Sequence, residues 1–429
     1  MLQVIAAACA VALLLGPLRM DRNGSFSAVT PTGWTIAALV LALPTLQLIP
    51  LPPGLWQSLP GRELALESLT LVGAAGGWRP WSLFPAHTLA SLLAMIPPVL
   101  LMLVVCRLPG NMRWQIVAAA IVAIMAGLAL GALQLASGPQ SGLRFYAQSN
   151  PGWLNGFQAN RNAQADVLLI GMVAATALLA TLRDSGRHVP WFAAATLVGL
   201  MALGVVLTGS RMGMGLLCLA LPVCGILWFG LQRRVLVAAG ILLPIAAAGA
   251  WLLRGSTTLG RSMGRFAQEG DFRSELWADG LQAIALYLPW GAGMGSASPI
   301  LVALERLEVL DVSRPNRVHN DYLELLIEGG LPALLLLASI LTLLGLAAVQ
   351  RLRRGNTASR REVLAATAIL AIVGLHSLVD YPLRSMALAH LAALAAGMIL
   401  ANGTGSRNGD RNRIAPQPNG GAGILRAHE

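Results

Sequence analysis

Long apolar stretches, separated by arginine, proline and tryptophan, run through most of this 429-residue chain. A helix of about 20 apolar residues crosses the roughly 30 Å hydrocarbon core of a bilayer, and only structures that satisfy their own backbone hydrogen bonds persist there. About eleven stretches have about 18 or more residues and meet this requirement. The sequence therefore predicts an all-α polytopic membrane protein. The predicted spans are residues 1–18, 34–51, 87–106, 114–136, 162–182, 190–208, 211–230, 235–253, 321–349, 363–381 and 385–402.

The charge of the chain fits the same class. Hydrophobic residues make up 56% of the sequence and charged residues 11%, which is typical of a membrane protein. All 30 basic residues are arginine, against 19 acids, and the net charge is +11. In a soluble protein this excess would suggest nucleic acid as a partner. Here it indicates loop arginines that orient helices and contact anionic lipids, so we expect membrane lipids and no nucleic acid.

The arginines of the short connections predict the orientation. Thirteen lie on one side and six on the other, and the richer side is expected to be cytoplasmic. The N-terminus and the long loop 254–320 are then outside, and the C-terminal tail is inside. Segment 1–18 lacks a basic leader and a cleavage site, so it is expected to be a retained helix. The thirteen are Arg19, Arg22, Arg107, Arg113, Arg183, Arg187, Arg233, Arg234, Arg351, Arg353, Arg354, Arg360 and Arg361; the six are Arg62, Arg79, Arg144, Arg161, Arg211 and Arg384.

Four parts follow from this pattern. Residues 1–253 form an N-terminal bundle of about eight transmembrane helices. Residues 254–320 form one large external loop, the one extramembrane segment that we expect to hold structure, in the form of short helices. Residues 321–402 form the C-terminal transmembrane helices. Residues 403–429 are rich in Gly, Asn and Arg, so we expect a disordered cytoplasmic tail.

The external loop is dense in arginine, and two explanations stay open. The arginines could be solvated and paired with the acids of the same loop. They could also bind an anionic pyrophosphate at the membrane surface, because a guanidinium group binds phosphate in a bidentate manner and stays charged. The loop arginines are Arg254, Arg261, Arg265, Arg273, Arg306, Arg314 and Arg317.

His319 follows this loop, within Arg317-Val318-His319-Asn320-Asp321-Tyr322-Leu323. The apolar spacing beyond it predicts a helix that begins near Asn320 or Asp321 and bends at 329–332. A helix N-terminus favours an anion, and an imidazole beside it can take a proton at neutral pH. A lone histidine is more often structural, but the neighbouring arginines, Asn320 and Tyr322 make a catalytic base an equally good interpretation.

Three other external features carry polar groups. Arg211 is the first residue of a predicted span and follows Thr208-Gly209-Ser210. Its side chain either extends to the membrane surface or binds a phosphate. Arg161 and Asn162 end Phe157-Gln158-Ala159-Asn160-Arg161-Asn162, where they could bind sugar hydroxyls, although helix capping is favoured for one of the asparagines. His376 and Asp380 stand four residues apart on one predicted helix face, and we expect mutual pairing rather than a functional role.

Several kinds of chemistry have no motif in this sequence. Gly291-Ala292-Gly293-Met294-Gly295 lacks a preceding strand and a following acid, so it does not predict a dinucleotide loop. The sequence contains no Walker loop, no HExxH and no carboxylate cluster that would suggest a bound divalent ion. We therefore expect neither a cofactor nor a metal ion.

The motifs and their order resemble those of the O-antigen ligase and O-antigen polymerase superfamily of bacterial membrane glycosyltransferases. The resemblance covers about 85–395 and is strongest over 200–335. It rests on Phe157 to Asn162, on Thr208-Gly209-Ser210-Arg211, on Arg273-Ser274-Glu275-Leu276-Trp277 with Gly291 to Gly295, and on Val318 to Leu323 with Glu328-Gly329-Gly330.

The resemblance implies a function. Members transfer a glycan from undecaprenyl pyrophosphate to an acceptor hydroxyl at the periplasmic face of the bacterial inner membrane, without metal and with inversion. It makes His319 the base and Arg211, Arg273 and Arg317 the ligands of the pyrophosphate. Members often have about twelve helices with an inside N-terminus, so the absence of a first helix is a departure here.

The shared motifs concern the donor and leave the acceptor open. The lipid A core in lipopolysaccharide biosynthesis, a growing polysaccharide, an exopolysaccharide and, less favoured, a protein are all compatible with the resemblance. An alternative function is a transporter or flippase of a lipid-linked saccharide or anionic solute. Such a protein should place ionisable residues along a path through the midplane, whereas here they gather at the outer ends of the spans.

Overall fold

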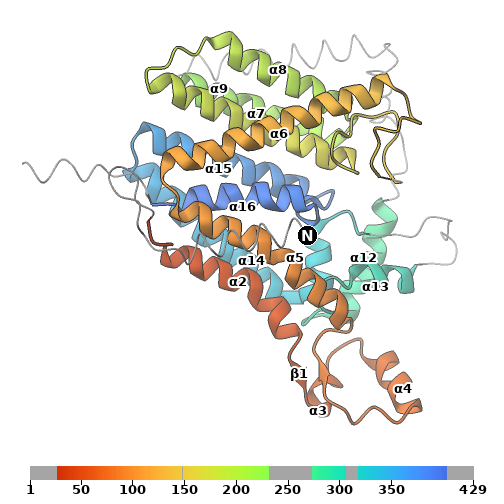
Figure 1. Cartoon of the computed structure of the whole chain (residues 1–429). Helices are drawn as coiled ribbons and strands as arrows, with labels where there is room; N and C mark the ends of the chain where they lie inside the picture. The colour runs from red at the N-terminus through yellow and green to blue at the C-terminus, as the bar shows by residue number, and fades with distance from the viewer. Residues whose placement is uncertain (1–26, 147, 231–272, 306–316, 403–429) are drawn as a thin grey trace, which may run out of the picture.

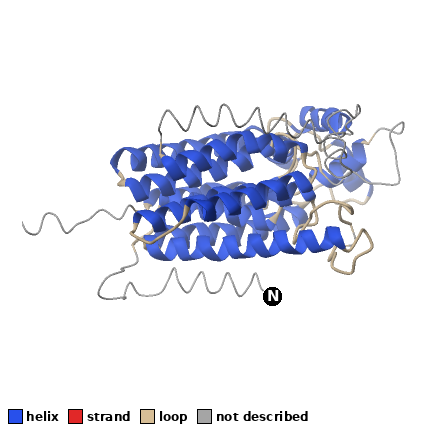
Figure 2. Ribbon diagram, turned by 90° about the horizontal axis from the view of Figure 1, so that it is seen from above, coloured by secondary structure: helices blue, strands red, loops and turns tan. Residues whose placement is uncertain are grey.

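The protein is a bundle of long helices lying side by side (Figures 1 and 2). The computed structural model describes residues 27–146, 148–230, 273–305 and 317–402. Within these ranges the chain is mostly helical, with a single pair of two-residue strands. The long helices are α2 (Pro31–Gln47), α5 (Pro85–Arg107), α6 (Gly110–Ala136), α7 (Arg161–Asp184), α8 (Trp191–Leu207), α9 (Arg211–Phe229), α14 (Asp321–Arg354), α15 (Thr357–His376) and α16 (Met386–Leu400).

Each predicted span that lies within the described residues overlaps a helix, although α15 ends at His376 rather than at 381. In these ranges, five helices are long and apolar enough to cross a membrane, namely α5, α6, α7, α9 and α14. The helices α8 and α16 are apolar but shorter. These helices confirm the prediction that the chain is a membrane protein. The count of about eleven crossings stays a prediction, and the spans 1–18 and 235–253 lie outside the described residues, as does the tail 403–429.

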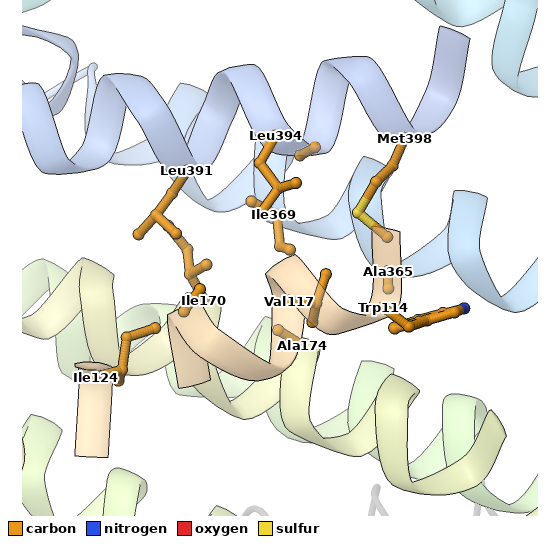
Figure 3. A pocket seen from close by; sticks show the side chains of 12 residues that line it. Trp114, Val117, Ile124, Ile170, Ala174, Ala365, Ile369, Leu391, Leu394 and Met398 are labelled. Atoms are coloured by element: carbon orange, nitrogen blue, oxygen red, sulfur yellow. The ribbon is translucent and has the colours of Figure 1, made fainter. Parts of the chain in front are cut away.

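Helix α7 forms the centre of the bundle. Fifteen of its residues are buried, and it packs against α6, α8, α9 and α15. Figure 3 shows a small apolar pocket within this core, lined by Ile170 and Ala174 of α7, Val117 of α6, Ile369 of α15 and Leu394 of α16. All five belong to the buried hydrophobic cluster that holds the middle of the bundle together.

Successive helices run in opposite directions, so their connections gather at two ends (Figure 1). The end that carries α12 and α13 is called the loop-rich end below. Segment 48–84 also lies there and contains structure, so the expectation that 254–320 alone would be structured is wrong. Buried Trp56 explains this, because its indole N–H donates to Gly77 O at 3.0 Å and organises the segment. The elements of this end are β1 (Pro50–Leu51), α3 (Pro53–Trp56), α4 (Glu63–Leu71), β2 (Arg79–Pro80), α12 (Arg273–Tyr287), α13 (Ala297–Leu304) and the 3-10 turn η3 (Pro382–Arg384).

The opposite end is rich in arginine. Arg113 of α6 binds Glu362 of α15 at 2.5 Å, and Arg351 of α14 binds the same carboxylate at 2.9 Å. Arg361 binds Asp184 at 2.8 Å. These pairs fasten four helices where they leave the apolar core. Arg113 and Glu362 are both buried, and a buried charge needs such a partner.

Helix α14 bends at Gly330, as the sequence predicted. Gly330 has φ 58° and ψ −150°, which only glycine adopts readily. A Cβ there would overlap the carbonyl of Pro289, and the amide of Leu331 donates to that carbonyl at 2.8 Å. The bend therefore brings the chain around Pro289 into contact with the first turns of α14.

Candidate functional site

His319 stands at the start of α14 in a strained conformation. Among the described residues it is the only non-glycine with a positive φ, 55°, and such a conformation persists only where the surroundings enforce it. Asn320 enforces it locally as the N-cap, accepting from the amides of Tyr322 and Leu323 at 3.0 and 3.1 Å. The predicted helix start is confirmed, and it fixes the direction of the imidazole.

The imidazole of His319 is bound to Asp380. Nδ1 lies 3.1 Å from Oδ1 of Asp380, and the ring meets Tyr381 edge-on with centroids 4.9 Å apart. An ionised carboxylate only accepts hydrogen bonds, so Nδ1 carries the proton of this bond. In the neutral ring Nε2 then carries the lone pair. This is the tautomer that a general base requires.

Asp380 lies beyond the end of α15, in the connection to η3, and is almost completely buried. It accepts from the amide of Tyr381 at 3.0 Å and from Nδ2 of Asn162 in α7. Burial alone would raise the pKa of Asp380, but the hydrogen bond and charge of His319, with help from His376 and Asn162, place it below its ordinary value. Asp380 is therefore ionised and able to stabilise a protonated His319.

A second histidine–carboxylate pair lies beside the first. Nδ1 of His376 is 2.5 Å from Oδ1 of Asp166, and both side chains are 1% exposed. Asp166 is one helical turn from Asn162 on α7, so both face the same direction. The expected pairing of His376 with Asp380 is wrong. Helix α15 ends at His376, so the two residues do not share a helix face and each pairs with another element.

Arg384 of η3 binds three carboxylates of α14. Its nearest contacts are 2.6 Å to Glu328, 3.3 Å to Glu324 and 3.8 Å to Asp321. Burial alone would lower the pKa of Arg384, but these carboxylates outweigh burial and raise it. The spacing of the acids places them on one face of α14. Arg384 thus joins η3 to the helix that positions His319.

The glycine-rich segment predicted by motif lies against the bend of α14. The amide of Gly293 donates to Glu328 O at 2.9 Å, and the amide of Ala297 donates to Oε1 of Glu328 at 3.3 Å. Gly291 has φ 75°, and a Cβ there would overlap the backbone of Glu328. The glycine-rich segment 291–295 and the bend of α14 therefore form one scaffold on the helix that begins beside His319.

Arg211 and Arg161 also belong to the loop-rich end. Arg211 is the first residue of α9, and Ser210 caps this helix by accepting from Gly213 N at 3.1 Å. Gly213 contacts Ala165 of α7, which places the start of α9 beside the start of α7. The guanidinium of Arg161 lies over the ring of Trp153, 5.2 Å from its centroid. The capping role predicted near Arg161 is confirmed, since Asn160 accepts from the amide of Asn162 at 2.9 Å.

The remaining predicted residues are held in various ways. The hydroxyl of Tyr322 donates to Gly374 O of α15 at 2.8 Å, and Nδ2 of Asn320 donates to Leu378 O just beyond α15 at 2.9 Å. Both bonds fasten the start of α14 to the end of α15 and the residues that follow it. Arg317 binds buried Glu324. Arg273 begins α12, and its charge acts on His376. That these residues bind substrate stays a prediction.

The chain was compared with known proteins. Residues 196–338 match the family model described as O-antigen ligase. The chain contains an O-antigen ligase domain. The resemblance drawn from the sequence is thereby confirmed over these residues. No curated protein matches the chain.

The O-antigen ligase domain covers only part of the site. It includes His319, Arg211 and Arg273, but Asp380 and Asn162 lie outside residues 196–338. Asp380 is the residue of the candidate site that the sequence placed wrongly, since the predicted helix face paired it with His376. The only signal available was a charged residue at the predicted outer end of a span, and it did not reveal the partner.

Proposed function

We propose that this protein transfers a glycan from undecaprenyl pyrophosphate to an acceptor hydroxyl, with His319 as general base. One observation carries the proposal: within an O-antigen ligase domain, a strained histidine has its Nδ1 bound to a buried carboxylate. We place the site at the periplasmic face of a bacterial inner membrane, because the arginine-rich end is expected to be cytoplasmic.

The geometry supports an inverting displacement. Nε2 of His319 takes the proton of the acceptor hydroxyl as its oxygen forms a bond to the anomeric carbon. The bond from that carbon to the phosphate oxygen breaks on the opposite side, and undecaprenyl pyrophosphate leaves with the electron pair. Asp380 stabilises the imidazolium that forms, as a buried carboxylate can.

The leaving pyrophosphate needs cationic partners. Arg211 and Arg273 begin helices α9 and α12, where the helix N-termini favour an anion. We assign these two arginines to the pyrophosphate. Arg317 is a third candidate, and its guanidinium binds Glu324. No metal ion is required in this scheme, since guanidinium groups supply the positive charge.

The apolar middle of the bundle favours this function over a flippase. In the described part of the chain, the pocket in Figure 3 is lined by apolar residues, among them Val117, Ile124, Ile170, Ala174 and Ile369. A path for a charged solute would require polar groups at this depth. The ion pairs among the described residues lie instead toward the two ends of the bundle, which is the arrangement expected for chemistry at a surface.

A variant of His319 tests the proposal. His319→Asn removes the base but keeps a residue type that tolerates a positive φ, so folding should be retained. Glycan transfer by the purified protein in proteoliposomes should fall about 10²- to 10⁴-fold, the usual contribution of general base catalysis. His188→Asn, in an exposed position outside the site, is the matched control. Full transfer by His319→Asn would exclude His319 as the base.

A further inference from the structure

A cavity of about 220 Å³ opens beside His319. It lies between the start of α7 and the connection from α15 to α16, and it contacts His319 through Asp380 and Tyr381. This is room for several water molecules, and it can admit one sugar ring. The described residues that line it are Tyr146, Gln158, Ala159, Asn160, Ala163, Asp166, Asp380, Tyr381, Pro382, Arg384 and Ser385.

The charged groups of the lining all have partners within the protein. Asp166 is paired with His376, Asp380 with His319, and Arg384 with the carboxylates of α14. Neither Arg211 nor Arg273 lines the cavity. A pyrophosphate would find no uncompensated positive charge among the described lining residues, so the cavity suits a neutral, hydroxyl-rich group better than the donor's leaving group.

Aromatic and amide side chains stand at the cavity. Tyr146 is half exposed, and its hydroxyl donates to Phe157 O at 3.2 Å. Phe157 stacks on Phe145 with centroids 6.4 Å apart. Gln158 lies across from Ser385, whose hydroxyl is 3.5 Å from Oε1 of Gln158. Sugars offer an apolar C–H face and hydroxyl groups, which match an aromatic ring beside an amide.

We propose that this cavity is the subsite for the acceptor sugar, with Tyr146 and Gln158 as residues that determine specificity. That the bound sugar is the acceptor rests on the proposed function. That the cavity binds a sugar rests on the cavity alone. A sugar seated here lies against Tyr381 and Asp380, both in contact with His319. The subsite is then adjacent to the residues that hold the base, while the pyrophosphate binds elsewhere.

Binding of simple sugars tests the subsite without requiring turnover. The full chain in nanodiscs is examined by saturation-transfer difference NMR, with N-acetylglucosamine and galactose as neutral probes and glucose 1-phosphate as an anionic probe. The wild-type protein should saturate at least one neutral probe more strongly than the anion. Tyr146→Ser and Gln158→Leu should each weaken that signal roughly fivefold or more, as expected for the loss of an average hydrogen bond.

The control is Phe192→Ser, which removes an exposed aromatic residue from α8, outside the cavity, and should leave the signal unchanged. No saturation of either neutral probe by the wild-type protein, a stronger signal from glucose 1-phosphate, or an undiminished signal in either cavity variant would overturn the subsite. His319→Asn should keep the sugar signal. A retained signal together with full glycan transfer by His319→Asn would refute the proposed base and leave the sugar subsite standing.

Discussion

The hydrogen bond between His319 and Asp380 makes the strongest quantitative prediction. Asp380→Asn keeps the size of the side chain but removes a buried charge 3.1 Å from Nδ1. A hydrogen bond to a charged group contributes about 1.5–3 kcal/mol, and about 1.36 kcal/mol corresponds to a tenfold change in rate. The transfer rate should therefore fall at least about 10- to 150-fold.

The orientation of the new amide in Asp380→Asn follows from its donors. Oδ1 of Asp380 accepts from the amide of Tyr381 as well as from His319, whereas Oδ2 accepts from Asn162. The amide oxygen is therefore expected to stay toward His319 and Tyr381, and the NH₂ then faces the NH₂ of Asn162, which leaves two donors opposed. Adding Asn162→Asp supplies an acceptor for that NH₂, so the double variant should recover part of the lost activity.

The assay is the initial rate of glycan transfer in proteoliposomes, with the folded fraction checked by thermal unfolding. Asp184→Asn is the control, because it also replaces a carboxylate by an amide but lies at the arginine-rich end. If Asp380→Asn transfers within about threefold of wild type, less than the charged hydrogen bond predicts, Asp380 does not act through His319.

Three further predictions follow from the same structure. Arg211→Lys replaces a bidentate fork by a point charge, so the KM for the lipid-linked donor should rise about tenfold or more; an unchanged donor KM would remove Arg211 from the pyrophosphate site. Gly330→Ala should lower the free energy of unfolding by about 1–3 kcal/mol, because φ of Gly330 is 58° and an added Cβ would overlap the carbonyl of Pro289. Thermal unfolding in detergent measures this effect, and an unchanged Tm would contradict the need for glycine at this position. The pKa of Asp380 is lower in the folded protein than in the unfolded chain. The stability that its ionised form contributes is therefore present above the unfolded pKa of about 4 and is lost as pH falls through the folded pKa. The Tm difference between wild type and Asp380→Asn should shrink below about pH 4, and a difference that stays constant with pH would exclude this linkage.

The sequence predicted those features that depend on local patterns. Apolar length placed the described long helices, and cap and bend signals placed the start of α14 and the bend at Gly330. Arginine at the ends of the spans correctly indicated two polar ends. These predictions succeeded because the signals lie within a few residues of the features that they predict.

Pairings between distant segments could not be predicted in this way. Asp380 reaches His319 across 61 residues and Asn162 across 218, and no spacing rule connects them. The i, i+4 rule assigned Asp380 to His376 because it assumed that the helix continued to residue 381. Segment 48–84 was missed because its fold depends on one buried tryptophan, Trp56, and on a two-residue strand pair, both too short to produce a periodic pattern.

Release of the lipid carrier is the most direct measure of the central claim. Purified protein in proteoliposomes is supplied with undecaprenyl-pyrophosphate glycan and either lipid A core or excess donor as acceptor. The account predicts that undecaprenyl pyrophosphate appears in equal amount to the glycan transferred, and that His319→Asn abolishes both. Movement of intact donor between leaflets without release of undecaprenyl pyrophosphate would contradict the account and indicate a flippase.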